Sequence, residues 1–80
     1  MVVELTLKDS AQLRKDIALN GYSIRGYARS IKISEPYLSA IINEQRTPSP
    51  RTAGKIADGL NQKIDDIFFA ASVHKSNTAV

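Results

Sequence analysis

Two helix starts headed by serine lie eleven residues apart, at Ser23 and Ser34, and this spacing constrains the fold more than any other feature of the chain. Each serine hydroxyl can accept a hydrogen bond from a first-turn backbone N–H that has no partner within the helix. An apolar residue, Tyr22 or Ile33, precedes each serine and can pack one turn into the helix. The repeated signal predicts two short helices joined by a tight turn.

Two helices joined in this way form a helix-turn-helix, which small proteins use mainly to place the second helix in the major groove of DNA. The charge distribution follows the same segment. Between Arg25 and Lys55 six basic residues face two acids, a net charge of +4, whereas between Asp58 and Asp66 three acids face one lysine. A molecule whose basic residues gather on one face can bind a polyanion there, so we expect double-stranded DNA as the partner. The alternative is that the basic residues form an ordinary solvated surface.

The size of the chain predicts one domain of packed helices. With 80 residues, no cysteine and His74 alone, neither disulfides nor zinc can stabilise it, and we expect no metal or other cofactor. We expect a domain over 1–75 and a disordered tail over 76–80.

The sequence shows no secretory signal and no apolar run long enough to span a membrane, which predicts a soluble cytoplasmic protein without membrane contacts. It also lacks a nucleophile–base pair and a phosphate-binding loop, so we expect neither an enzyme nor a small-molecule substrate.

Caps, breakers and apolar spacing predict an all-α fold of five helices. The predicted helices cover 9–19, 24–31, 35–43, a stretch from Pro50 that is capped by Ser49, and 64–68. Segments 2–7 and 69–75 are strand-like, and we expect a minor pairing of the two that leans on a neighbouring helix. The expected core residues are Leu13, Ile17, Tyr27, Ala28, Ile31, Leu38, Ile41, Ile42, Ala53, Ile56, Ala57, Leu60, Ile64, Ile67 and Phe68.

The order and spacing of several short motifs resemble those of a known family. The carriers are segments 21–28, 33–39, 48–50, 55–60 and 64–68. They resemble the Cro and repressor-type helix-turn-helix proteins, the XRE family, and within it small phage and prophage regulators of Gram-positive bacteria. The resemblance covers residues 13–69. It implies a compact, lambda-repressor-like five-helix domain, dimeric operator binding with the third helix in the major groove, and regulation of transcription in a phage genetic switch.

Three positions depart from the family pattern. Ile24 stands where the family commonly has a glutamine that braces the DNA backbone and the recognition helix, which weakens the transfer of DNA contacts. Lys32 and Glu44 stand where the family has glycines, one in the turn and one after the recognition helix. A residue other than glycine costs up to about 1 kcal/mol if its backbone is left-handed.

The family places base-reading side chains near the start of the third helix and one turn further on, and a sixth candidate lies near its far end. The candidates are Glu35, Pro36, Tyr37, Ser39, Ala40 and Asn43. Only Asn43 belongs to the types that read a base bidentately, although Glu35 can accept a hydrogen bond from a cytosine amine. The alternatives stay open: Glu35 as a helix-dipole partner, Tyr37 as a partly buried core residue, and Ser39 as a solvated one.

Phosphate contacts are expected at helix N-termini and from cations beside the third helix. The candidates are Ser23, Arg25, Arg29, Ser34, Arg46, Thr47, Arg51 and Thr52.

A second hypothesis keeps the fold and changes the partner. Because the third helix carries short and apolar side chains, it also suits a protein surface, as in a modulator that binds a partner phage repressor and has little DNA affinity alone. The resemblance also implies a homodimer. Its expected surface is the fifth helix with the terminal strand, where Phe68 or Phe69 would remain exposed.

Overall fold

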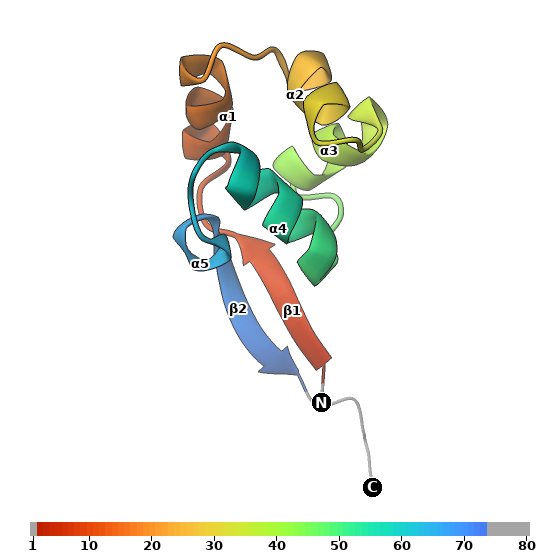
Figure 1. The fold of residues 1–80 in the computed structure, drawn as a ribbon. Coiled ribbons are helices and arrows are strands. Elements are labelled where there is room, and N and C mark those ends of the chain that lie inside the picture. The colour runs from red at the N-terminus through yellow and green to blue at the C-terminus, as the bar shows by residue number, and fades with distance from the viewer. Residues whose placement is uncertain (1, 74–80) are drawn as a thin grey trace, which may run out of the picture.

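The structure, a computed structural model, describes residues 2–73 as five helices and a two-stranded sheet (Figure 1). The elements are β1 (Val2–Leu7), α1 (Ser10–Leu19), α2 (Ile24–Ser30), α3 (Glu35–Ile42), α4 (Pro50–Gly59), α5 (Ile64–Ile67) and β2 (Phe68–Val73). The predicted fold class is therefore confirmed, and the four helices with a predicted end, α1, α2, α3 and α5, end within one residue of it. The expected tail over 76–80 lies outside the described residues.

The second, third and fourth helices begin where their serine caps predicted, and the first begins after a cap at Asp9, which we expected to be its first helical residue. Asp9, Ser23, Ser34 and Ser49 each accept a hydrogen bond from the backbone N–H three residues later. The expected packing of Tyr22 onto the first turn of α2 is also present, because its ring lies 5.2 Å from that of Tyr27.

Each of the four longer helices is followed, two positions after its last residue, by a residue with left-handed backbone. These residues are Gly21, Lys32, Glu44 and Asn61, with φ angles of 85°, 63°, 62° and 56°. Behind each of them the next N–H reaches back to a helix carbonyl, as from Ile33 to Ala28 and from Gln45 to Ala40. The lysine and the glutamate that replace family glycines therefore do occupy strained positions.

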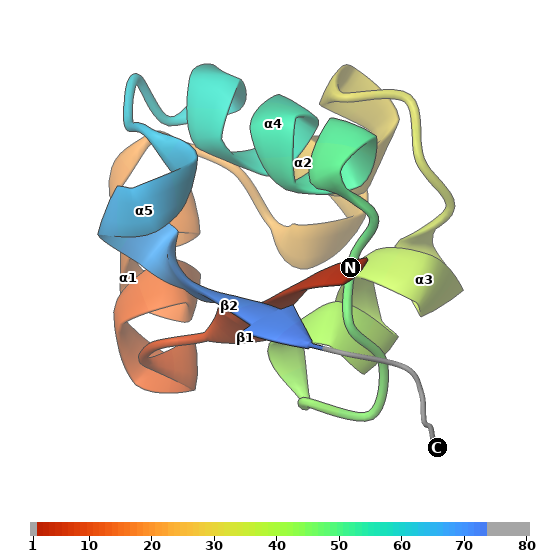
Figure 2. The same cartoon turned by 90° about the horizontal axis from the view of Figure 1, so that it is seen from below.

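The two strands pair, as predicted, and the structure shows that they run antiparallel, with Leu7 opposite Phe68 and Leu5 opposite Ala70. Both leucines and Phe68 are buried, so the ribbon is stabilised by packing against the helices. In Figure 2 the strands cross between α1 and α5 on one side and α3 on the other. One detail of the prediction was wrong: Phe68 begins β2 instead of ending α5. Phe68 is buried, as expected of a core residue, because it faces the helices, and of the two phenylalanines it is Phe69 that faces outward and stays 60% exposed.

The core is a single cluster that contains almost every predicted member, and Ile31 and Ile64 lie partly buried at its edge. Tyr27 is fully buried at its centre, where its hydroxyl donates a hydrogen bond to the Ile56 carbonyl. Burial, together with the nearby Tyr22 and Asp58, raises the pKa of Tyr27 to about 12. This bond ties α2 to α4 and so fixes the scaffold from which α3 projects.

Candidate nucleic-acid interface

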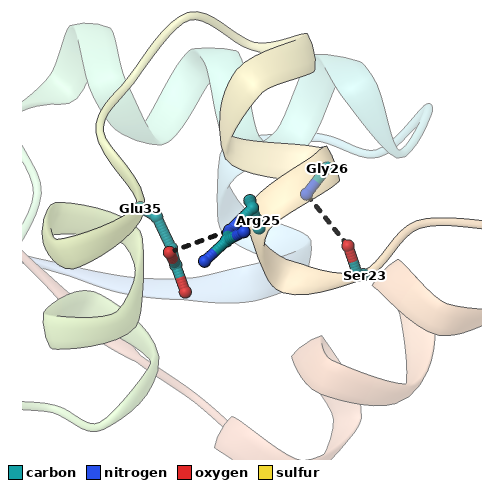
Figure 3. Close-up of polar contacts among 4 residues, drawn as sticks. All are labelled: Ser23, Arg25, Gly26 and Glu35. Atoms are coloured by element: carbon teal, nitrogen blue, oxygen red, sulfur yellow. Dashed lines mark hydrogen bonds and ion pairs between the residues drawn. The ribbon is translucent and has the colours of Figure 1, made fainter.

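The N-termini of α2 and α3 are joined by an ion pair. Arg25 Nε lies 3.4 Å from Glu35 Oε1, and Figure 3 shows the two side chains pointing toward each other from the two helices. The side chains are 73% and 44% exposed, so water screens the pair and its contribution to stability is small. Because Arg25 donates through Nε, its two terminal nitrogens stay available to a ligand.

The outward side of α3 carries small side chains. Leu38, Ile41 and Ile42 point into the core, so helical geometry places the opposite stripe outward. That stripe consists of Pro36, Ser39, Ala40 and Asn43, with Pro36 and Asn43 exposed and the other two half-buried. Four of the six base-reading candidates therefore share one ridge. Glu35 and Tyr37 flank it on either side.

Arg46 covers the second flank of α3. After the helix ends, the N–H groups of Gln45 and Arg46 both donate to the Ala40 carbonyl, which folds the loop back. The Arg46 guanidinium consequently lies 5.0 Å from the centre of the Tyr37 ring. Tyr37 is half-buried and packs against the core, which favours a partly buried core role over base contact.

The far end of α3 is bound to α1. The Ser10 hydroxyl donates to the Ile42 carbonyl at 2.7 Å, and one turn further along α1 the Arg14 side chain donates to Asn43 Oδ1 at 2.6 Å. Arg14 was not among the candidates from the sequence. No local pattern marks it, since its partner lies 29 residues away and only the crossing of α1 and α3 brings the two together.

Two further arginines of the candidate set are exposed. Arg29 lines a surface hollow between α2 and α3 together with Arg25 and Glu35. Arg51 is exposed in the first turn of α4, and Thr47 is exposed in the loop before that helix.

Three hydroxyl candidates serve the fold. Ser23 and Ser34 are exposed, but each already caps its helix, with the Gly26 and Tyr37 N–H groups 3.0 and 3.2 Å away. Thr52 is only 9% exposed, and its hydroxyl accepts a hydrogen bond from the Ser49 hydroxyl at 3.0 Å. Its burial argues against a phosphate contact by the Thr52 side chain, so we leave this residue out of the interface.

Comparison with known proteins places the chain in a family. The family model described as "Helix-turn-helix" matches residues 11–67. The "Uncharacterized HTH-type transcriptional regulator YvzC" of Bacillus subtilis is 33% identical over 73 residues, which cover 85% of this chain and 95% of that protein. No solved structure matches the chain significantly. The chain belongs to the helix-turn-helix family, in agreement with the resemblance seen in its motifs.

Two kinds of feature are absent from the part of the chain that the structure describes. None of the helices within residues 2–73 is long and apolar enough to cross a membrane. The same residues hold no group of three histidine, cysteine or acidic side chains arranged to bind a metal ion.

Proposed function

We propose that this protein is a sequence-specific DNA-binding regulator of transcription that places α3 in the major groove. The observation that carries the proposal is the outward ridge of α3, which is narrow enough to enter a groove and is flanked by Arg25 on one side and Arg46 on the other. The regulator named in the comparison supports the same role. In this role the protein acts in the cytoplasm, without a cofactor and not as an enzyme.

The contacts divide by chemistry. Arg25, Arg29, Arg46 and Arg51, with the Thr47 loop, bind phosphates, because all of them are exposed beside α3 or at its neighbouring helix ends. The helix-capping Ser23 and Ser34 present the N-termini of α2 and α3 to the backbone. Glu35 and the ridge residues Pro36, Ser39 and Ala40 meet base edges, where a proline ring or an alanine methyl can pack on a thymine methyl.

A salt-titrated binding assay on the DNA that flanks the encoding gene tests the proposal. Neutralising about four to six phosphates gives a steep fall of affinity with salt, since each phosphate adds about 0.9 to the slope of log K against log salt. Arg46→Ala and Arg51→Ala should each lower that slope by about one. A matched control is Lys63→Ala, which removes the same charge from the N-terminus of α5. If both arginine variants bind as the parent does, this set of contacts is wrong.

The ridge also supports a second candidate function, a modulator that binds a partner repressor. Pro36, Ser39 and Ala40 form no bidentate hydrogen bonds to bases, and small or apolar side chains suit a protein surface. A gel shift with and without the cognate repressor separates the two functions. A modulator alone leaves operator DNA unshifted at physiological salt, whereas a DNA-binding regulator shifts it without help.

The biological setting belongs to the same proposal. The motifs that resemble small phage and prophage regulators favour a role in a phage genetic switch, and dimeric operator binding requires a second copy of the chain. Phe69 on β2 offers the apolar surface for that copy, since it is 60% exposed.

A further inference from the structure

Three arginines from three different elements are each bound to a residue of α3 or its cap. Arg25 of α2 pairs with Glu35 at the start, Arg46 of the following loop lies over Tyr37, and Arg14 of α1 donates to Asn43 at the end. The first two belong to the proposed interface. The third lies on the first helix, outside the helix-turn-helix.

Two hydrogen bonds between α1 and the end of α3 fix the position of Arg14. Ser10 and Arg14 are four residues apart and so share one face of α1, and they bind the consecutive residues Ile42 and Asn43. Asn43 lies on the outward ridge of α3 and is exposed, as is Arg14. The guanidinium therefore lies on the same side of the molecule as the ridge.

A major groove that holds α3 brings the DNA backbones close to both ends of the helix. A helix with its side chains is about 10–12 Å across and the major groove is about 12 Å wide, so α3 fills the width of the groove. Cations bound beside the first turn and beside the last turn of α3 therefore lie within reach of the phosphates that border the groove.

We propose that Arg14 is a phosphate contact at the C-terminal end of α3, and that Asn43 positions this arginine instead of reading a base. The inference rests on the proposed function and extends the DNA interface to α1. The Asn43 oxygen accepts from Arg14, so one of its two lone pairs is used and the amide is held in an orientation set by the arginine, not by an adenine edge. Arg14 donates to Asn43 through one terminal nitrogen and keeps further N–H groups for a phosphate.

The test uses a duplex selected from a random-sequence pool by the wild-type protein, with affinity measured from 50 to 200 mM KCl. Arg14→Ala should lower the slope of log K against log salt by about 0.9. The ratio of wild-type affinity to variant affinity should therefore shrink about threefold over this range. Arg14→Gln, which keeps a donor for Asn43 but no charge, should lower the slope equally. The matched control is Lys15→Ala on the next, exposed position of α1, which points about 100° away round the helix and should leave the slope unchanged.

Asn43→Ala tests the positioning role. It should weaken binding while the base preference at every position of the duplex stays as in wild type. A base-reading asparagine would instead lose about 5- to 150-fold of preference at one position, which would overturn this part of the proposal. A structural role of Arg14 alone would lower affinity in Arg14→Ala without changing the salt slope, and that result would overturn the phosphate contact. Failure to select any duplex would contradict the proposed function itself.

Discussion

The phenol ring of Tyr27 lies directly over Gly59, so that a Cβ atom at position 59 would lie 3.0 Å from Tyr27 Cζ and closer still to its hydroxyl oxygen. The glycine near the end of α4 is thus required by close approach, since its own φ angle is not left-handed. The same hydroxyl donates to the Ile56 carbonyl one turn earlier. Tyr27 therefore packs on one helix turn through both a contact and a hydrogen bond.

Gly59→Ala should lower the free energy of unfolding by about 1–3 kcal/mol, because the buried tyrosine cannot move without disturbing the core. Urea denaturation followed by circular dichroism measures the loss. Tyr27→Phe in the same chain should recover part of it by removing the hydroxyl. Gly54→Ala is the control: its Cβ would lie 3.9 Å from Ile64 Cδ1, an ordinary contact, and it should stabilise the helix by about 0.5–1 kcal/mol. If Gly54→Ala lowers the free energy of unfolding as much as Gly59→Ala does, the close contact with the Tyr27 ring is not the cause.

Alkaline pH should destabilise the protein through Tyr27. Its pKa is about 12 in the folded state, against 10.0 for an ordinary tyrosine, so the folded state favours the neutral phenol. The resulting stability is fully present below pH 10 and is lost as the pH rises toward 12. Urea midpoints measured across this range should fall more steeply for wild type than for Tyr27→Phe. Parallel curves would show that other groups cause the loss.

Glycine at the two strained helix ends should stabilise the fold. Lys32→Gly and Glu44→Gly should each raise the free energy of unfolding by up to about 1 kcal/mol, because the left-handed strain exceeds the extra chain entropy that glycine loses. Asn61→Gly should gain less, since asparagine tolerates this conformation. Thermal melts of the three variants provide the ranking. A larger gain at position 61 than at 32 or 44 would refute the argument.

Replacing Glu35 should change DNA recognition far more than stability. The exposed ion pair with Arg25 contributes less than about 1 kcal/mol, so Glu35→Ala should melt close to wild type. If Glu35 accepts from a cytosine amine, the variant loses preference at one base pair, as selection from a random pool would reveal. If Glu35→Ala instead binds all sequences equally more tightly, Glu35 reads no base and acts only as a partner of the helix dipole.

Dimerisation should depend on Phe69. Light scattering over a concentration series should show a dimer for wild type and a shift toward monomer for Phe69→Ser, because the ring is exposed on the outer face of the ribbon. Leu19→Ser is the control, since Leu19 is also exposed, at 74%, but lies on α1. If the wild-type protein stays monomeric both with and without DNA, the prediction of a dimer is wrong.

Local chemistry in the sequence determined the helices and their order. A capping serine acts on an N–H three residues away, and an apolar stripe repeats within a turn, so Ser23, Ser34 and Ser49 mark their helices without any knowledge of the fold. The pairing of the strands was also predictable, because the chain offers only two strand-like segments. The ridge of α3 followed from the same periodicity.

Only the tertiary structure decided which side chains meet across the elements. Arg14 reaches Asn43 because α1 crosses the end of α3, and Thr52 turns inward because α4 packs on the core. The choice between Phe68 and Phe69 likewise depended on the face that the ribbon turns toward the helices. These outcomes depend on relative positions of distant segments, which packing sets and local spacing does not encode.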